Sequence, residues 1–319
     1  MPEWTKFPDR PLRIALLIFD AFSNLCLANC IEPLRAANTL APAAGFDWQL
    51  LSPDGSPVRS SSGIEVLPHA ALPVLTRCDR LFVLASYGHE RHDHAATRQA
   101  LSSAARRSGT VVGFDAAPWL LASAGLLAGR RATVHWDLLD AFAERFLDVG
   151  AERARVIRDG PVVTCAGAMS ALDFTLDLIA AQMGIATRLD VEALFMQGDP
   201  PVGGGQAAQA DPLVARAMAQ MRDHLERPLP LNVLAAQLST QPRTLDRRCR
   251  AALGAPPGTV YRQLRLSAAR KLIEESRLGL TEIALRCGYD SAAALSRAIR
   301  RQYGRAPRLL RQAARARRV

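Results

Sequence analysis

Short apolar runs alternate with amphipathic stretches over roughly the first two hundred residues of the chain. The apolar runs predict strands at Arg13–Phe19, Trp48–Ser52, Arg80–Ala85, Thr110–Phe114, Ala132–His135 and Val162–Cys165. The stretches between them predict helices near Leu27–Leu40, Ala95–Arg107, Ala116–Leu127, Asp137–Phe146 and Met169–Met183. Alternation of this kind is typical of an α/β fold with an open, mostly parallel sheet and helices on both faces.

The pattern changes after a segment rich in proline and glycine at 198–206. Beyond it no strand-like alternation appears, and the spacing of apolar residues predicts helices at about 212–226, 231–238, 242–252, 257–275, 280–286, 291–303 and 307–314. We therefore predict an α/β domain at 11–196, a linker at 197–211 and an all-α domain at 212–314.

The all-α domain contains an internal repeat at an offset of about fifty residues. Leu234-Ala235-Ala236 corresponds to Ile283-Ala284-Leu285, and in each copy an arginine, Arg247 or Arg297, precedes a glycine by seven residues. That glycine, Gly254 or Gly304, precedes a proline by three. A small residue at a tight helix crossing, a turn and an arginine-bearing second helix are the parts of a helix-turn-helix unit. Two such units in tandem predict DNA binding.

The helix predicted between the two units has two apolar faces. One face carries Val260, Leu264, Ala268 and Leu272, and a neighbouring one carries Leu266, Ala269 and Ile273. This suits a structural helix packed between two small bundles, and we expect it to make no base contacts.

The charge is distributed unevenly between the two domains. Residues 211–319 carry 22 Lys and Arg against 8 Asp and Glu, a net charge of +14, whereas residues 1–210 carry 18 against 22, a net charge of −4. A basic domain on a mildly acidic body is expected when one module faces a polyanion.

Other features exclude several classes of protein. The longest uncharged stretch, Pro228 to Pro242, holds three prolines and is too short to span a bilayer. Met1 to Arg10 is polar, so we expect no signal segment and a cytoplasmic location with reduced, buried cysteines. The segment His89 to His94 carries ligand-type side chains at irregular spacing and is interpreted as a solvated helix start. We expect no metal and no cofactor.

Residues from about 212 to 312 resemble the DNA-binding domain of AraC/XylS-family transcription regulators. The resemblance is carried by Leu234-Ala235, Thr244-Leu245-Asp246-Arg247, Arg265-Leu266, Thr281-Glu282-Ile283-Ala284, Cys287-Gly288-Tyr289, Ser296-Arg297, Tyr303-Gly304 and Pro307. It implies two recognition helices in successive major-groove segments of double-stranded DNA.

Arginine suits bidentate readout of guanine and clamping of phosphates. The predicted DNA-binding residues of the first unit are Gln241, Arg243, Thr244, Arg247 and Arg248; those of the second are Ser291, Ala292, Ser296, Arg297 and Arg300. Three positions depart from the family pattern: Gln241 replaces a serine, Cys249 an aromatic residue, and Ala294-Leu295 a His-Phe pair. We therefore predict that unit one carries most direct readout.

Residues from about 11 to 195 resemble the PfpI/glutamine-amidotransferase-like domain of GlxA-type AraC regulators. The matching residues are Ile31-Glu32-Pro33-Leu34-Arg35-Ala36-Ala37-Asn38, Gly125-Leu126-Leu127, Gly129-Arg130-Arg131-Ala132-Thr133, His135-Trp136, Cys165-Ala166-Gly167 and Asp173. Enzymes of that fold carry a cysteine at a sharp strand-to-helix turn, where this chain has Asp115. A carboxylate is a far weaker nucleophile than a thiolate, so the domain is interpreted as a ligand sensor and not an enzyme.

The predicted ligand-binding residues are Glu32, Asp115, Trp119, His135 and Trp136. If both acids line a pocket, a cationic or amine-bearing guest would fit, with the tryptophans offering aromatic faces. Asp115, followed by Pro118, also fits a plain helix N-cap, and both readings stay open.

The sequence thus predicts a transcription regulator that binds double-stranded DNA and a small-molecule effector. The family resemblance implies a homodimer, and RNA polymerase stays open as a further partner. Two alternatives remain: a PfpI-like hydrolase or lyase with a nucleic-acid tether, using Asp115 or an unrecognised thiol, and an architectural DNA-binding protein without ligand control.

Overall fold

The computed structural model describes residues 10–40, 45–195 and 211–316. Contacts between Cα atoms divide the chain into two compact units, Met1–Gln182 and Met183–Val319. The predicted linker at 197–211 lies outside the described residues except for Asp211. The division between the units falls ahead of that linker, so the end of the predicted first domain belongs with the second unit.

The first unit is built on a seven-stranded sheet in the order β10-β11-β7-β6-β1-β2-β5. All neighbouring strands are parallel except β10 and β11, which form an antiparallel pair at one edge. The strands are β1 Leu12–Ile18, β2 Phe46–Ser52, β5 Ala70–Ala71, β6 Cys78–Ala85, β7 Ser108–Asp115, β10 Val156–Asp159 and β11 Val162–Cys165. The predicted open and mostly parallel sheet is confirmed.

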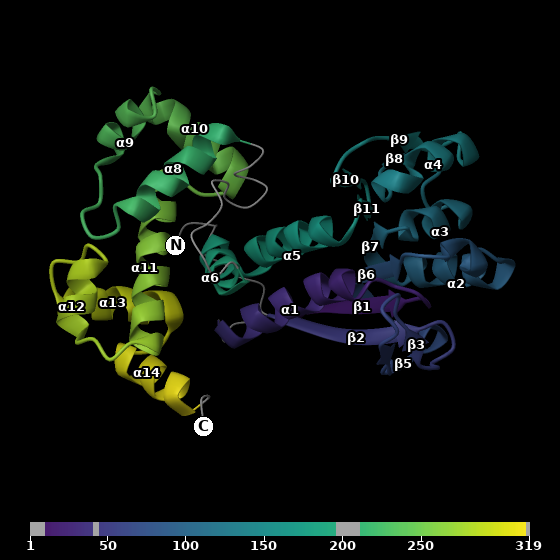
Figure 1. Cartoon of the computed structure of the whole chain (residues 1–319), viewed down its shortest axis with the longest axis horizontal. Coiled ribbons are helices and arrows are strands. Elements are labelled where there is room, and N and C mark those ends of the chain that lie inside the picture. The colour runs from purple at the N-terminus through teal and green to yellow at the C-terminus, as the bar shows by residue number, and fades with distance from the viewer. Residues whose placement is uncertain (1–9, 41–44, 196–210, 317–319) are drawn as a thin grey trace. The chain divides into compact units, whose positions relative to one another are not determined.

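Helices cover both faces of this sheet (Figure 1). On one face, helices α2 Ala95–Arg106, α3 Ala117–Ser123 and α4 Leu139–Arg145 join a buried cluster with alternate residues of β1 and β6 such as Leu17 and Val83. On the other face, Phe174 of α5 (Ala168–Met183) packs edge-on against Phe82 and Phe114. Helix α1 (Asn24–Leu40) also carries buried residues. Strands buried on both sides explain the continuous apolar runs in the sequence.

One predicted strand of this sheet is wrong. Of the segment Ala132–His135, only Ala132 is in a strand: it ends β8 (Arg131–Ala132), which pairs with β9 (Gly150–Ala151) in a separate two-stranded sheet. Thr133 explains the difference, because its backbone N–H donates to the hydroxyl of Thr164 instead of joining a ladder. A further short pair, β3 (Val58–Arg59) with β4 (Glu65–Val66), and the edge strands β5 and β10 went unpredicted.

The second unit is helical in its described residues, as predicted for 212–314. Its helices are α6 Ile185–Phe195, α8 Pro212–Asp223, α9 Leu231–Gln237, α10 Pro242–Leu253, α11 Pro257–Glu275, α12 Leu280–Arg286, α13 Ala292–Tyr303 and α14 Pro307–Ala316. The first of them, α6, lies within the predicted α/β domain and was not predicted. Helix α11 is long and runs past two groups of shorter helices, α8 to α10 and α12 to α14 (Figure 1).

The two groups have separate cores that α11 shares between them. Val260 and Leu264 of α11 belong to the core of the first group, whereas Leu266, Ala269 and Ile273 belong to that of the second. The prediction of two apolar faces is confirmed, but their membership is partly wrong, because Ala268 and Leu272 pack against the second core and not with Val260 and Leu264. The repeat is also visible in the cores, because Leu234, Ala235, Leu245 and Cys249 of the first are matched by Ile283, Ala284, Leu295 and Ile299 of the second.

Candidate ligand pocket and nucleic-acid interface

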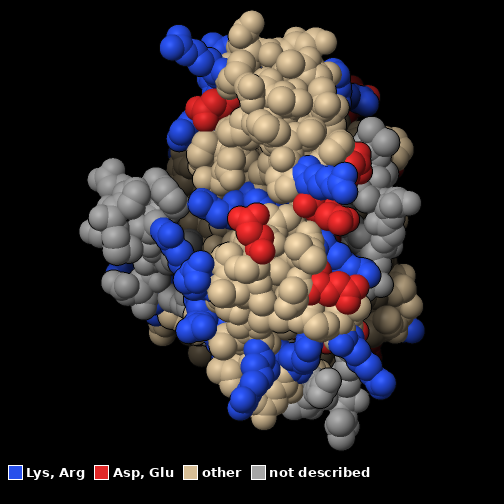
Figure 2. All heavy atoms as spheres, turned by 90° about the vertical axis from the view of Figure 1, so that its left-hand side faces the viewer, with Lys and Arg blue, Asp and Glu red and all other residues tan. Residues whose placement is uncertain are grey.

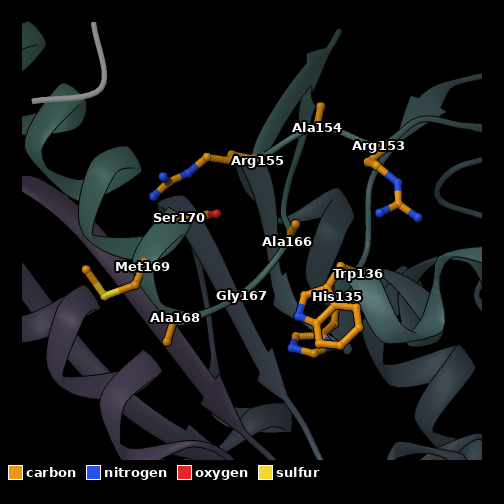
Figure 3. A pocket seen from close by; sticks show the side chains of 10 residues that line it. All are labelled: His135, Trp136, Arg153, Ala154, Arg155, Ala166, Gly167, Ala168, Met169 and Ser170. Atoms are coloured by element: carbon orange, nitrogen blue, oxygen red, sulfur yellow. The ribbon is translucent and has the colours of Figure 1, made fainter. Parts of the chain in front are cut away.

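A cavity of about 440 Å³ lies in the first unit where α5 begins. It is lined by His135, Trp136, Arg153, Ala154, Arg155, Ala166, Gly167, Ala168, Met169 and Ser170 (Figure 3). Its volume is within the range of small-molecule sites. Of the five predicted ligand-binding residues, the structure places two, His135 and Trp136, in this lining.

His135 and Trp136 form one wall of the cavity. Their rings lie 5.4 Å apart between centroids and are tilted by 37°, and Trp136 is 64% exposed. Gly167 lies opposite His135 with φ 145°, a conformation that side-chain-bearing residues rarely adopt. The glycine lets the chain turn into α5 close beside the imidazole of His135. The indole ring of Trp136 remains accessible at the mouth of the cavity.

Two arginines that the sequence analysis did not single out also line the cavity. The guanidinium of Arg155 is bound to the carboxylate of Asp173 on α5. Arg153 is exposed, and its side chain has no hydrogen bond or ion pair to any residue that the structure describes. Figure 3 shows Arg153 on the same side as Trp136, with Arg155 directed away from it. No Asp or Glu belongs to the lining, which therefore favours an anionic group.

Asp115 lies directly behind this wall, at the end of β7. Its φ of 62° gives the strand-to-helix turn the sharp bend that the sequence predicted. The hydroxyl of Ser86 donates to its carboxylate at 2.7 Å, and the backbone N–H of His135 donates to its carbonyl at 2.9 Å. Burial raises the pKa of the Asp115 carboxyl, while Ser86, His135 and His89 act in the opposite direction. Asp115 is thus a polar support for the His135 wall, and its side chain makes no cap bond to α3.

Gly113, two residues earlier on β7, keeps that bend tight. A Cβ atom at this position would lie 2.7 Å from Cδ1 of Leu121 and 3.3 Å from the backbone nitrogen of Pro118. Helix α3 therefore packs back onto the strand that precedes it.

The structure places the other two predicted ligand residues away from the cavity. Trp119 is half-buried and packs edge-on against Phe146 and His89 and tilted against Phe142, against the core on the α3 side of the sheet. Glu32 is bound to Arg35, one turn further along α1. The two acids therefore do not meet, and the pairing on which a cationic guest was predicted is absent.

A residue that sequence reasoning missed connects α1 to the cavity instead. The amide of Asn29 donates to the carbonyl of Ala168 at 2.8 Å, at the first residue of α5. Asn29 lies one turn before Pro33 and just ahead of the segment that carries the family resemblance, and its hydrogen bond to Ala168 distinguishes it from Glu32.

The segment His89 to His94 does not converge on one point. His89 is buried against Trp119, Asp93 binds Arg98 and Ser123, and His94 accepts a hydrogen bond from the N–H of Thr97 at the start of α2. Among the residues that the structure describes, no group of three His, Cys, Asp or Glu side chains could hold a metal ion.

The six cysteines are buried and unpaired. Burial raises the pKa of Cys30 and of Cys165 well above the usual range, and it raises the pKa of Cys249 and of Cys287 to about 11. These thiols are held in the protonated, poorly nucleophilic form.

In the second unit, α9 and α10 form the first helix-turn-helix pair and α12 and α13 the second. Both second helices end at a glycine in the left-handed conformation, Gly254 with φ 69° and Gly304 with φ 66°. Such a C-cap stops each helix at the same place, so α10 and α13 are equally long. They are the two candidate recognition helices.

Helix α10 presents three of its predicted DNA-binding residues without restraint. The side chains of Gln241, Arg243 and Arg247 are exposed, and none has a hydrogen bond or ion pair to a described residue. Thr244 is partly exposed on the same helix. Gln241 makes no cap bond, consistent with its being a poorer N-cap than serine.

Arg248 is placed differently from its neighbour Arg247. Its guanidinium donates two hydrogen bonds to the carboxylate of Asp211. Asp211 also accepts from the backbone N–H groups of Leu213 and Val214 and so begins α8. The side chain of Arg248 is therefore committed to holding two helices together.

In helix α13, Ser291 is the N-cap, and its hydroxyl accepts from the N–H of Ala294 at 3.2 Å. Ala292 and Ser296 are partly exposed, and Arg297 and Arg300 are exposed without a partner among the described residues. Leu295, where the family has an aromatic residue, is fully buried in the core.

Figure 2 shows one face of the second unit. Lys and Arg side chains gather over its lower part and left flank, and Asp and Glu form smaller groups near the middle. The lower part is at the level of α12 to α14 in Figure 1. A face of this kind suits a phosphate backbone.

Two family descriptions match this chain. The DJ-1/PfpI family matches residues 12–181, and a helix-turn-helix domain matches residues 234–313. The described residues contain no helix with enough length and apolar character to cross a bilayer.

Several HTH-type transcriptional regulators are similar to the chain over most of its length. The HTH-type transcriptional regulator CdhR of Pseudomonas aeruginosa is 34% identical, covering 91% of this chain and 89% of its own. The HTH-type transcriptional regulator GlxA of Rhizobium meliloti is 32% identical, covering 94% and 95%. GbdR of Pseudomonas aeruginosa, another HTH-type transcriptional regulator, is 30% identical, covering 95% and 84%.

Solved structures support the fold of the first unit. A ThiJ/PfpI family protein from Pseudomonas syringae aligns with a TM-score of 0.53 at 24% identity, covering 70% of this chain and 91% of its own. An AraC family transcriptional regulator from Pseudomonas putida aligns with a TM-score of 0.51 at 22% identity, covering 58% and 100%.

Proposed function

This chain belongs to the DJ-1/PfpI family and is a DNA-binding HTH-type transcriptional regulator; from that premise we propose that its first unit senses a small molecule without catalysis. The sensing site is the cavity at the start of α5. The effector is a small zwitterionic molecule, with one anionic and one cationic or amine-bearing group. Its anionic group faces Arg153, and its cationic or amine-bearing group lies over the ring of Trp136.

One observation carries this assignment, the pairing of an uncommitted guanidinium with an exposed indole at one cavity. Arginine offers donors in a geometry that matches a carboxylate, and the face of tryptophan attracts a cation. The second arginine, Arg155, is neutralised by Asp173, so one guanidinium remains for the ligand. The amine-bearing ligand predicted from the sequence can therefore still contact an aromatic ring, that of Trp136, and we propose that it also carries an anionic group that binds Arg153.

The test is binding to the full-length protein. A panel should hold amino acids and betaines, amines that lack a carboxylate, and carboxylates that lack an amine. The increase in Tm in a thermal-shift assay should be largest for the zwitterionic compounds, the amino acids and betaines. Titration calorimetry then measures their affinities. Arg153→Ala should weaken binding at least about tenfold, since a charge-assisted hydrogen bond contributes about 1.5–3 kcal/mol.

Arg106→Ala is the matched control, because it removes the same charge from an exposed position on α2 that does not line the cavity. Its affinity should equal that of the wild type. If both variants weakened ligand binding equally, the loss would come from the change in net charge and not from a contact of Arg153 with the ligand. Binding of amines alone, unaffected by Arg153→Ala, would remove the proposed site.

The absence of catalysis is supported by the chemistry at the elbow. Asp115 stands where enzymatic relatives have cysteine, and the thiols of Cys30 and Cys165 are kept protonated by burial. We expect no turnover of glyoxals or amides and no loss of DNA binding after treatment with iodoacetamide. Turnover that disappears in Asp115→Asn would instead establish the hydrolase or lyase.

Two copies of the chain are proposed to act together as a homodimer in the cytoplasm, in contact with RNA polymerase at the promoter. Light scattering of the full-length protein gives the oligomeric state. A monomer that binds its DNA site without cooperativity would contradict the dimer.

A further inference from the structure

Helix α6 lies outside the segment matched by the helix-turn-helix domain, yet it packs within the second unit. It follows α5 after Gly184, whose φ is 88°. Leu189 of α6 is buried in the core of the first bundle, together with Val214 of α8 and Leu264 of α11. On its apolar side, α6 is therefore a part of the first helix-turn-helix bundle.

On its polar side the same helix reaches the second bundle. The hydroxyl of Ser267 on α11 donates to the carboxylate of Asp190. The hydroxyl of Tyr303, the last residue of α13, donates to the same oxygen at 3.5 Å, and Arg270 lies 3.8 Å from the other oxygen. Arg270 also stacks over the ring of Tyr303 at 4.7 Å, which joins the group into one buried cluster.

The charges on α6 are buried. Arg188 and Glu192 pair with each other across one turn, and Asp190 lies between them with its pKa raised by burial to about 6. Buried charges contribute little net stability because their desolvation offsets their attraction. They do impose a defined geometry, since a displaced partner would leave a charge without compensation. The cluster is thus better suited to fixing an arrangement than to strengthening a core.

We propose that α6 is a clamp that fixes the orientation of the two helix-turn-helix units relative to each other, with Asp190 as its main positioning residue. Leu189 anchors the clamp in the first bundle, and Asp190 ties it to the end of α13 in the second. The two recognition helices must enter successive segments of the major groove, so their relative angle sets the separation of the base pairs that they read. This clamp acts on DNA reading whether or not the sensor cavity holds a ligand.

The spacing of the DNA site provides the test. A site is first selected from random duplexes with the full-length wild-type protein, and base substitutions locate the two segments read by α10 and α13. One base pair is then inserted or removed between the segments, which rotates one against the other by about 34°. The wild type should lose at least about tenfold in affinity for the altered site.

Asp190→Ala should lower affinity for the original site and reduce the loss caused by the altered spacing to below about threefold. Tyr303→Phe removes only the hydroxyl and should show the same relaxation in weaker form. Glu282→Gln, which removes an exposed acid paired with Arg286 on α12, is the matched control and should keep the wild-type spacing preference.

A structural defect alone would reduce affinity for both spacings by the same factor. Circular dichroism confirms folding, and Tyr303→Phe and Ser267→Ala carry the test if Asp190→Ala does not fold. Folded variants that keep the wild-type spacing preference would overturn the clamp. A wild type that binds both spacings equally would do the same.

Discussion

The guanidinium of Arg248, on the first recognition helix, donates two hydrogen bonds to the carboxylate of Asp211, the residue that begins helix α8. The neighbouring Arg247 points elsewhere and is exposed without a partner among the described residues. Adjacent positions on a helix differ by about 100° in direction, so two consecutive arginines serve different purposes. Arg248 joins helices, whereas Arg247 is available to DNA.

This difference predicts opposite effects for two alanine variants. Arg248→Ala should lower the Tm of the full-length protein and leave the salt dependence of DNA binding nearly unchanged. Arg247→Ala should keep the Tm and reduce the log–log salt slope by about 0.9 if Arg247 neutralises one phosphate. Thermal unfolding and binding titrations at several salt concentrations measure both effects. A slope reduced by Arg248→Ala alone would reverse the assignment.

The sequence could predict the positions of the two candidate recognition helices but not which of their arginines lack a partner within the described protein. The repeat, the two C-cap glycines and the apolar spacing located α10 and α13, because these features are local. Asp211 is far from Arg248 in sequence and next to a segment rich in proline and glycine, so no local sequence pattern predicted their contact. An arginine bound by a distant carboxylate and one in solvent have the same pattern in a sequence.

The two recognition helices should differ in how strongly they read bases. Helix α10 presents Gln241 and Arg243, whereas α13 presents alanines and uses its one serine cap internally. Arg243→Ala should therefore relax the preference on single-base variants of the selected site, while Arg297→Ala should weaken binding to all of them alike. Greater relaxation by Arg297→Ala would contradict this division.

The acid sensitivity of the first unit should depend on Asp79. Arg10 donates two hydrogen bonds to its carboxylate and the N–H of Arg13 a third, which lowers the pKa of Asp79 to about 2. Because the folded pKa lies below the unfolded value near 3.9, the stabilisation is present above that pH and is lost as the pH falls toward 2. Linkage would give about 2.5 kcal/mol, and solvent around the exposed Arg10 reduces this to about 1 kcal/mol.

Asp79→Asn should accordingly lower the free energy of unfolding by about 1 kcal/mol at pH 7, and most of this difference from the wild type should be lost by pH 2, where the folded carboxyl is half protonated. Denaturant unfolding from pH 7 to pH 2 follows it. Asp47→Asn, at an exposed position on β2, serves as the control. Its free energy of unfolding should differ from that of the wild type by the same amount at every pH. A constant difference over the whole range would mean that the Asp79 bonds act independently of its charge.

Three misassigned or missed features of the candidate sites have a common physical cause. No helix was predicted at 185–195, and its charged residues are buried: Arg188 and Glu192 because they pair, and Asp190 because α11 and α13 supply partners. Trp119 is a residue type that aromatic cages use, yet its position on α3 directs its side chain against the core of the first unit. Glu32 and Asn29 lie one turn apart on α1, and only the rotation of that helix against the sheet decides which reaches α5. Tertiary packing settles each case.

The turn between α12 and α13 should tolerate no side chain at Gly288. Its φ is 69°, and a Cβ atom there would lie 2.6 Å from the carbonyl oxygen of Leu225 and 2.7 Å from Pro228. Backbone atoms of that neighbouring loop cannot rotate away, so Gly288→Ala adds overlap to the strain of the left-handed conformation. We expect a loss of about 3 kcal/mol or more in the free energy of unfolding.

Gly304 provides the matched control for that variant, because it has nearly the same φ, 66°, with nothing within 4 Å of the position of a Cβ atom. Gly304→Ala should therefore cost only the conformational strain, about 1–2 kcal/mol. Denaturant unfolding of the full-length protein compares the two. Equal losses would mean that the loop at Leu225 moves aside, and the second helix-turn-helix would then be held less tightly against the first bundle than its packing implies.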